Sequence, residues 1–568
     1  MQRIARAFAW AMLFALAASF AAQKIRSFDY WWHLRSGQLI VETLSVPDAD
    51  PFSFSALGTP WLDIHWLHQV GLYGVHQLGG HAGVVAAKVG FIWAVLALLA
   101  AIGRSASRTT LSVAALVPVL VLVGDRLMPR PELATFALLS CVLLLLDRFE
   151  RRGDAWIWAV VPIVLVWANL HALFALGIAL CAMHLCAEAA RPLLRRGGLR
   201  GRRIAVLASV TLAATLVSLI NPNGLDGALY PFDQLRQIGL PEQRAALELR
   251  SAEISPFWDW QFQSPIAVAV FTVLGLASAL AMRLNSRRVR PVDWLVWLAF
   301  FLLSMAAIRN MALFAIVGAP ILVRNLNEWL DVRPGDRSDP APRSLDAGAA
   351  GVLGLILMLL TADVAMGRFY PRMNILREPG FEVLPMFHPE AAVDWIERER
   401  PPPPIAHHMA DGGYLIWRLY PDYRVLSDGR LDIFVRQPEL LRLSDAEAFR
   451  AADARYQFGT VLVHYAELGL GEWLQAMWRD PQWRMVFADD VAAVFVRRDR
   501  AGAAVLQPPD FDVMAAGVLP PLGASLSYSD ARRHLARAAL FSALGASWRA
   551  EAIRRDAARL YPQWVEAR

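Results

Sequence analysis

The sequence predicts a polytopic α-helical membrane protein that carries a small α/β domain and a helical tail at its C-terminal end. Hydrophobic residues make up 56% of the 568 residues and charged residues only 19%, and the mean hydropathy is +0.37. This composition is too apolar for an ordinary globular protein. After residue 368 the long apolar stretches give way to prolines, polar residues and short β-branched runs, which predict a soluble α/β domain.

Long apolar runs divide the first part of the chain into predicted membrane helices. A helix needs about 20 apolar residues to cross the hydrocarbon core. The basic and apolar N-terminus is interpreted as a retained first helix, because many more spans follow it. The runs predict about eleven helices, at residues 4–22, 82–103, 109–124, 131–147, 155–169, 172–190, 204–220, 264–282, 292–308, 311–323 and 345–366.

The distribution of arginine predicts the orientation of these helices. Loops between alternate runs hold most of the short-loop basic residues, in stretches such as "RFERRGD", "RPLLRRGGLRGRR" and "RLNSRRVRP". The positive-inside rule places these loops and the N-terminus in the cytoplasm. The first long loop, residues 23–81, and the chain after residue 367 then face the opposite side. The formal charge of +6 comes from the arginine-rich loops, so no nucleic-acid partner is indicated.

Three parts are expected along the chain. They are a transmembrane domain of residues 1–368 that includes the first loop, an extracytoplasmic α/β domain of residues 369–508, and a helical tail of residues 509–568. In the α/β domain, strands are predicted at residues 405–408, 424–427, 460–463, 484–487 and 491–496, with helices between them. In the tail, the Ala- and Arg-rich residues 527–560 predict a helical hairpin.

No disulfide and no metal site is predicted. Cys141, Cys181 and Cys186 all lie in apolar runs, which fits neither a disulfide framework nor a CxxC metal site. Asp48 and Asp50 stand among prolines, a setting that favours turns over a metal pair. No cofactor is therefore expected. A divalent cation is an alternative that no tight cluster of acids supports.

A glycine-rich block marks the predicted α/β domain. His407 and His408 precede it, and because adjacent strand residues point to opposite faces they do not predict a zinc site. In "DGGYLIWRLYPDYRVLSDGR", Gly412 and Gly413 allow a tight turn, and residues 428–430 follow a predicted strand end, where ligand loops often lie. Two interpretations stay open: the block binds an acceptor or covers the site, or the glycines only permit a turn.

The stretch "SFDYWWHLRSG" follows the first apolar run and combines an acid, three aromatics, a histidine and an arginine. One interpretation is structural: the aromatics form an interfacial belt and Asp29 caps the next helix. The other is chemical. A carboxylate at the end of a helix, close to the bilayer surface, is suitably held to act as a general base.

Several blocks resemble one family. The first loop from "DYWWHLRSG" to "VHQLGG", together with "MPRPELATFAL", "WANLHALFALG", "LINPNGLDGALYP", "AEISPFW", "AIRNMALFAI" and "DGGYLIWRLYPDYRVLSDGRLDIF", resembles a large bacterial family of multi-spanning proteins similar to GT-C glycosyltransferases. The resemblance covers most of residues 1–440. At one position the sequence departs from it: His65 stands where an acid is expected before "WL".

This resemblance implies a fold, a reaction and a location. GT-C enzymes transfer a sugar from a polyprenyl-phosphate donor to an acceptor, and they keep an essential acid in the first loop outside the membrane. Asp29 is in that position. The expected function is therefore hexosyl or pentosyl transfer in the bacterial inner membrane, to a glycan, lipid or protein acceptor. The lipid tail fixes the sugar near the headgroup layer, so the base must be held there too.

Substrate-binding residues are expected on the same side. The leaving phosphate needs cations, and the planar guanidinium of arginine suits it. The candidates are Arg126, Arg130, Arg309, His171 and, beside Asp29, His33. Arg309 is favoured, because a charge so close to the membrane interior is costly unless it faces a cavity or a partner.

Glu253, in the outer loop of residues 221–263, is expected to join Asp29 as a second acid or to orient the acceptor. The alternative is an ordinary solvated loop glutamate. Two other classes of function also remain. A transporter or flippase of a lipid-linked saccharide would be polytopic too, although no matching halves with interrupted helices are seen. A non-catalytic membrane scaffold for envelope assembly is the third class, and the departure at His65 keeps it open.

Overall fold

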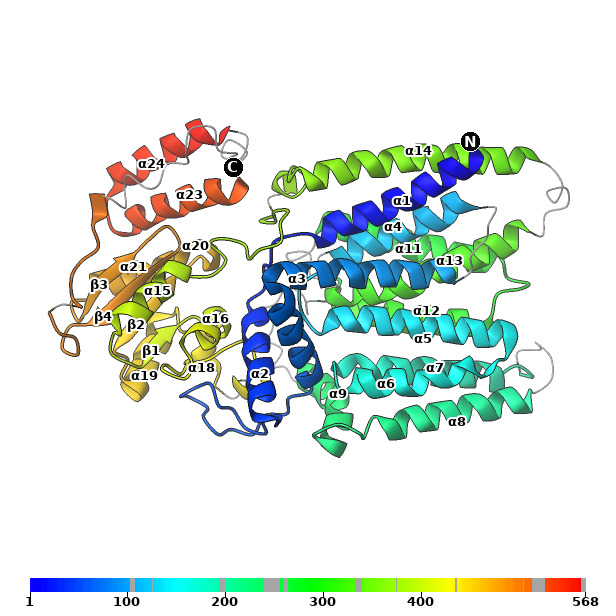
Figure 1. Ribbon diagram of the computed structural model, residues 1–568, viewed down its shortest axis with the longest axis horizontal. Coiled ribbons are helices and arrows are strands. Elements are labelled where there is room, and N and C mark those ends of the chain that lie inside the picture. Colours follow the sequence, from blue (N-terminus) through cyan, green and yellow to red (C-terminus); the bar gives the residue numbers. More distant parts are fainter. Residues whose placement is uncertain are drawn as a thin grey trace. The chain divides into compact units, whose positions relative to one another are not determined.

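The computed structural model divides the chain into two compact units (Figure 1). The first unit comprises residues 1–23, 64–68 and 78–366, and the second comprises residues 24–63, 69–77 and 367–568. The structure describes all residues except 103–107, 125, 194–199, 240–255, 259–263, 332–339, 374, 435–436, 504, 513–526 and 563–568.

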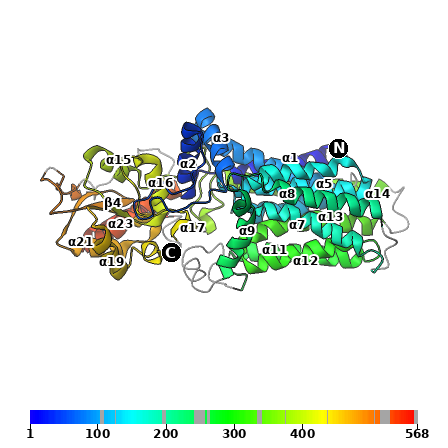
Figure 2. The same ribbon diagram turned by 90° about the horizontal axis from the view of Figure 1, so that it is seen from below.

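The first unit is a bundle of helices that run side by side along one direction, as Figures 1 and 2 both show. Its elements are α1 (Gln2–Ala21), α3 (Trp66–Ala101), α4 (Thr109–Gly124), α5 (Glu132–Arg152), η1 (Ala155–Ala159), α6 (Val160–Ala168), η2 (Ala172–Phe174), α7 (Ala175–Ala189), α8 (Gly201–Val217), α9 (Gly224–Gly239), α11 (Pro265–Leu284), α12 (Pro291–Ala306), η5 (Ile308–Asn310), α13 (Met311–Leu330) and α14 (Pro340–Ala365). The helix α3 is kinked at Gly80, and its residues 69–77 belong to the second unit.

The predicted apolar runs coincide with these helices, and the predicted start of the second run at residue 82 matches the kink of α3. Among the described residues, six helical segments are long and apolar enough to cross a membrane: residues 2–21, 66–101, 172–189, 265–284, 308–330 and 344–365. Three shorter apolar helices, at residues 109–124, 155–168 and 291–306, accompany them. The chain therefore has the features of a multi-pass membrane protein. The number of eleven spans stays a prediction.

Helix α13 is the most buried element of the bundle. Every side chain from Met311 to Ile321 is buried, whereas α1, α11 and α14 bury only about a third of their apolar windows. A helix that is apolar on all sides belongs in the interior, and one with a single buried face belongs at the surface. The helices α4, α5, α11 and α12 pack against α13.

The second unit contains one mixed sheet of four strands in the order β1-β2-β4-β3. The strands are β1 (Ile405–His407), β2 (Thr460–His464), β3 (Trp483–Ala488) and β4 (Ala492–Arg497). β1 is parallel to β2, in the register Ile405 to Thr460, and β4 is antiparallel to both β2 and β3. The strand β2 is fully buried, as expected for the centre of a sheet that is covered on both faces.

Helices cover this sheet and extend the unit. They are α15 (Glu390–Glu399), α16 (Met409–Leu419), α17 (Leu431–Phe434), α18 (Pro438–Leu441), α19 (Ala446–Tyr456), α20 (Tyr465–Leu468), α21 (Gly471–Arg479), α23 (Tyr528–Ala543) and α24 (Ser547–Leu560). The predicted helical hairpin of the tail is confirmed, because α23 and α24 pack through Ala538, Phe541, Ala550 and Ile553. A capping box between Ser527 and Asp530 begins α23.

The predicted strand at residues 424–427 is wrong. Only Val425 pairs there, in an isolated bridge with Ser53 of the first loop. The N–H of Val425 donates to Phe52 O and the N–H of Phe54 donates to Val425 O, both at 3.0 Å. The backbone groups of this β-branched run therefore find their partners in a loop segment far away in sequence, and no ladder forms.

The first loop packs as part of the second unit. It contributes α2 (Asp29–Thr43) and the segments around it. Ile25 bridges Val383, and Lys24 forms ion pairs with Glu378 and Glu382 at 3.2 and 2.9 Å. The sequence predicts that this loop belongs to the transmembrane domain of residues 1–368. Its long-range contacts lie instead with the C-terminal residues.

Candidate functional site

The candidate base, Asp29, is the first residue of α2. A carboxylate in this position is favoured by the positive end of the helix dipole. The indole Nε1–H of Trp32 donates to Asp29 Oδ1 at 3.2 Å, which fixes the direction of the carboxylate. Asp29 is half-buried. It begins the helix without a side-chain cap, because the N-cap position is Phe28.

The backbone of Gly429 lies directly against Asp29. A Cβ added at Gly429 would overlap Asp29 Oδ1 and would lie 3.2 Å from Trp32 Nε1. Only glycine allows the loop to approach the carboxylate so closely. The "SDGR" block and the "SFDYWWHLRSG" stretch, some four hundred residues apart in sequence, therefore meet in the second unit around one carboxyl group.

The aromatic residues beside Asp29 are packed inside the second unit. Tyr30 is fully buried, and Trp31 and Trp32 are 4% and 6% exposed. The indole of Trp31 donates to His388 Nε2 at 2.8 Å and contacts the ring of Tyr414 at 5.0 Å. These aromatic side chains therefore belong to the core of the second unit, and the interpretation of them as an interfacial belt is wrong.

His33 follows Asp29 by one helical turn and is 3% exposed, with its ring 3.6 Å from that of Trp32. Residues four apart lie on the same face of a helix, so the structure places both predicted residues on one side of α2. The role of His33 in substrate binding stays a prediction.

Arg430 connects the first loop to the "SDGR" block. Its guanidinium donates to Asp428 at 2.6 Å and forms an ion pair with Asp50 at 2.7 Å. It also lies over the rings of Trp61 and Phe52, at 4.6 and 5.1 Å. A buried guanidinium needs charged partners of this kind, because an unpaired buried charge is costly. The sequence interpretation did not single out Arg430 as this anchor.

The predicted turn at Asp50 is confirmed. Its carboxylate accepts from the backbone N–H groups of Phe52 and Ser53, both at 3.1 Å. His407 and His408 also behave as structural residues. His407 Nε2 accepts from the N–H of Leu426 at 2.9 Å, and His408 caps α16.

A second candidate region lies in the first unit, at the start of α3 and α7. His171 follows α6 and begins η2, and its Nδ1 lies 3.0 Å from Thr135 Oγ1. Its ring is 5.6 Å from that of His65, which directly precedes α3. The indole of Trp167 donates to the same Thr135 hydroxyl at 2.9 Å. The polar break predicted between two helices at "WANLHALF" is confirmed.

Asn169 holds this region together. Its Oδ1 accepts from Trp66 Nε1 and its Nδ2 donates to Ile220 O, both at 2.9 Å. Its carbonyl also accepts from the N–H of Leu67 at 3.3 Å. One asparagine thus ties the start of α3 to the ends of α6 and α8.

The cations predicted to bind phosphate gather around His171. Arg126 donates to Glu132 at 3.0 Å, and Arg309 lies half-buried in η5. Burial first, and then neighbouring cations that include Arg309 and Arg126, hold the pKa of His171 well below its usual range. Burial also lowers the pKa of His65 to about 4. Both imidazoles are therefore neutral at neutral pH, and the positive charge belongs to the arginines.

We call His65, His68, Arg126, His171 and Arg309 the cationic cluster. The structure thus brings together three of the residues predicted from the sequence. Arg130 lies in the same connection as Arg126, between α4 and α5. Glu253 lies outside the described residues. His68 was missed, although its spacing of three residues from His65 in "HWLH" puts both on one helix face.

No metal centre is found in the part of the chain that the structure describes. No group of three or more His, Cys, Asp or Glu side chains there is arranged to hold an ion. The residues of the two regions can instead accept a proton at Asp29 and bind an anion at the cationic cluster.

Comparison with known proteins identifies a fold and no family. No protein-family model matches the chain, and no curated protein matches its sequence. Seventeen solved chains match its structure. One is the apo oligosaccharyltransferase of Archaeoglobus fulgidus, with a TM-score of 0.50 and 13% sequence identity. The match covers 82% of this chain and 71% of that chain, so the chain has a fold similar to that of an oligosaccharyltransferase.

Proposed function

We propose that the protein is an integral-membrane glycosyltransferase of the GT-C type. It transfers a sugar from a polyprenyl-phosphate donor to a glycan, lipid or protein acceptor outside the cytoplasm of a bacterial cell. The observation that carries the proposal is the oligosaccharyltransferase-like fold, which extends over 82% of the chain. The arrangement of Asp29 and the composition of the cationic cluster support it.

Asp29 acts as the general base. Its carboxylate accepts the proton of the acceptor hydroxyl while that oxygen bonds to the anomeric carbon of the donor sugar. A base must be held in a fixed direction to do this. Trp32 and the close backbone of Gly429 hold Asp29 in this way.

The leaving group of this reaction is the polyprenyl phosphate. As the bond between the anomeric carbon and the phosphate oxygen breaks, the electron pair stays on the polyprenyl phosphate. Within the first unit, Arg309 and Arg126 are the proposed phosphate-binding residues, because guanidinium groups donate two hydrogen bonds to phosphate oxygens. Neutral His65 and His171 add hydrogen-bonding groups and no further charge. The reaction balances without a cofactor, and none is proposed.

Replacement of Asp29 by Asn tests the proposal. Asn keeps the size of the side chain and can still accept from Trp32, but it cannot take a proton. We expect sugar transfer from a labelled polyprenyl-phosphate sugar to fall by about 10²- to 10⁴-fold in membranes that contain equal amounts of protein. Asp48→Asn is the matched control, because Asp48 is an exposed acid of the same loop, and it should retain activity.

The same assay separates the alternative functions. If Asp29→Asn transferred sugar as fast as the wild type, Asp29 would not be the base. If the wild type moved a labelled lipid-linked sugar across liposomes without consuming it, the protein would be a transporter. A wild type that neither consumes nor moves such donors, and whose Asp29 variant keeps the cellular phenotype, would be a scaffold.

A further inference from the structure

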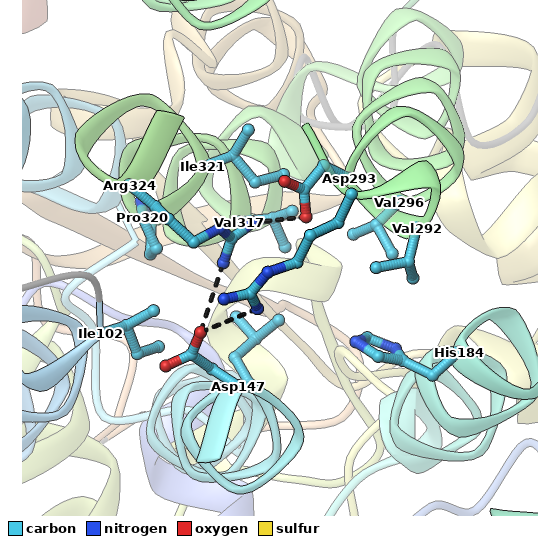
Figure 3. Close-up of a pocket in the computed structure, with 12 residues that line it drawn as sticks. Ile102, Asp147, His184, Val292, Asp293, Val296, Val317, Pro320, Ile321 and Arg324 are labelled. Carbon is cyan, nitrogen blue, oxygen red and sulfur yellow. Dashed lines mark hydrogen bonds and ion pairs between the residues drawn. The ribbon is translucent and has the colours of Figure 1, made fainter. Parts of the chain in front are cut away.

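The buried guanidinium groups of this chain carry a permanent charge. Arg324 pairs with Asp147 at 3.5 Å and with Asp293, in the wall of a small cavity of the first unit (Figure 3). Arg430 of the second unit is paired with carboxylates in the same way. A guanidinium does not lose its proton in a protein. His464 of the second unit is different, because an imidazole can lose its proton near neutral pH.

His464 is the last residue of β2 and lies between two hydrogen-bond acceptors. Its side chain is fully buried. Its Nδ1 is 2.7 Å from Asp411 Oδ1, and its Nε2 is 3.2 Å from the carbonyl oxygen of Met386. An ionised carboxylate and a carbonyl can only accept hydrogen bonds, so both ring nitrogens must carry a proton. The two contacts therefore require the imidazolium form of His464.

The charged groups around His464 favour the same form. Burial lowers the pKa of His464, but the Asp411 carboxylate beside it and, more weakly, Glu467 raise it, so the pKa lies above 6.5. The groups that act on these two acids in turn are His407, His408, Arg26 and Arg532. The local charges therefore agree with the hydrogen bonds.

The carbonyl that accepts from His464 belongs to a strained turn. The N–H of Phe387 donates to Leu384 O at 3.3 Å and closes a β-turn whose central residues are Pro385 and Met386. Met386 has a φ of 67°. With proline at the second position, a positive φ at the third position makes this a type II turn, in which the third residue is usually glycine. A methionine there is strained, so the turn depends on the contacts that hold it.

This turn supports the start of α2. Phe387 stacks on Phe28 with 4.3 Å between the ring centroids, and His388 Nε2 accepts from the indole of Trp31 at 2.8 Å. Phe28 and Trp31 stand on either side of Asp29, the first residue of α2. A change in the turn therefore reaches the chain both before and after Asp29.

Loss of one proton from His464 removes one of its two hydrogen bonds, because a neutral imidazole has a single N–H donor. Asp411 retains that donor, since its Oδ2 has no hydrogen-bond partner in the described part of the chain and an unpaired buried carboxylate is costly. Nε2 then presents a lone pair to Met386 O. Among the described residues no other donor bonds to this buried carbonyl, so the strained turn loses the contact that holds it.

We propose that His464 and the turn of residues 384–387 form a pH-sensitive device that controls how firmly the start of α2 is held. When His464 is protonated, the turn is closed and holds Phe28 and Trp31. When the proton has passed to solvent, the turn opens and the first turn of α2 loosens. The proposal does not rest on the proposed function, because it concerns the order of these two segments and not sugar transfer.

Hydrogen exchange of the purified full chain, measured by mass spectrometry and corrected for the intrinsic rate, tests the device. As the pH rises above 6.5 and through the raised pKa of His464, exchange in residues 384–388 and 28–33 should accelerate together, by about 5- to 100-fold, because a buried carbonyl loses its donor. Exchange in α24 should not change. If either segment kept its corrected rate, or if α24 accelerated equally, the proposal would be wrong.

Two variants should fix the device in opposite states. His464→Gln has no charge at any pH, so residues 384–388 should exchange fast below pH 6.5 as well. Asp411→Asn lets a neutral His464 accept from the Asn amide at Nδ1 and donate from Nε2 to Met386 O, so exchange should stay slow as the pH rises.

His534→Gln is the matched control, because it changes another buried histidine of the second unit and should retain the pH dependence. If His464→Gln does not fold, Asp411→Asn still decides. An acceleration that persists in Asp411→Asn would assign the pH dependence to another group, such as His388, and would overturn the proposal.

Discussion

Single residues in the second unit are constrained by close backbone approach. Gly412 lies inside α16, and a Cβ there would overlap Ser427 O and would lie 2.9 Å from Asp428 Cα. The "DGG" block therefore does not form a turn, which was one interpretation of the sequence. Its glycine lets a helix pack on the backbone of the "SDGR" block, next to Gly429 and Asp29.

Replacement of Gly412 by Ala should destabilise the second unit. The added Cβ meets backbone atoms, which cannot rotate away, and overpacking of this kind costs about 1–3 kcal/mol. The free energy of opening of α16, measured by hydrogen exchange in the full chain, should fall by that amount. Gly471→Ala is the control, because no atom lies within 4 Å of a Cβ at Gly471. An equal loss in both variants would contradict this account.

A buried acid-base pair lies beside the same helix. His464 Nδ1 is 2.7 Å from Asp411 Oδ1, and both side chains are fully buried. Burial disfavours the charged imidazole, but the Asp411 carboxylate outweighs it and raises the pKa of His464 above 6.5. Burial likewise disfavours the carboxylate, and His464 outweighs it and lowers the pKa of Asp411 below 3.8.

The pair predicts a loss of stability on both sides of a pH window. The raised pKa of His464 gives stabilisation that is complete below pH 6.5 and is lost as the pH rises through the raised value. The lowered pKa of Asp411 gives stabilisation that is complete above pH 3.8 and is lost as the pH falls. The free energy of opening of β2, from hydrogen exchange corrected for the intrinsic rate, should therefore decrease as the pH rises above 6.5 and through the raised pKa of His464.

His464→Gln should remove this dependence and lower the free energy of opening by about 3–5 kcal/mol below pH 6.5, because it leaves Asp411 buried without its partner. His407 cannot produce the same trend. Burial lowers the pKa of His407, so its contribution is lost as the pH falls. A decrease above pH 6.5 that persists in the variant would exclude the pair as its cause.

At the scale of elements, the pattern of residues along the chain predicted those helices and helix ends that local sequence determines. Apolar runs became helices, because a helix satisfies its own backbone and needs only apolar length to cross a bilayer. The tail hairpin and the break at "WANLHALF" were predicted for the same reason, since caps and polar interruptions act over a few residues.

Elements that depend on distant partners could not be predicted in this way. Residues 424–427 have the composition of a strand, yet their backbone partners are Phe52 and Phe54 of the first loop. The contact of Asp29 with Gly429 is equally long-range. The motif blocks identified both participants of that contact but not their proximity, because spacing along the chain does not encode which loop packs on which helix.

At the scale of the whole molecule, each of the two units is built from segments that are separate in sequence. Residues 24–63 lie between two helices of the first unit in sequence but pack with residues 367–568. Lys24, Ile25, Ser53 and Asp50 all have their partners after residue 367. Folding of the first loop therefore depends on a segment that is synthesised more than three hundred residues later.

Removal of residues 367–568 tests this dependence. In the shortened chain, the buried Asp50 loses Arg430, and Tyr30 and Trp31 lose the core that covers them, so residues 24–63 should become sensitive to protease. The helices of the first unit keep their contacts and should stay protected. Limited proteolysis in membranes, with the cut sites mapped by mass spectrometry, measures the protease sensitivity of the loop and of the helices. The control is removal of only the residues from Ser527 onward, which spares Arg430 and Tyr414 and should leave the loop protected. If the loop resisted protease in the chain that lacks residues 367–568, it would fold with the membrane helices instead.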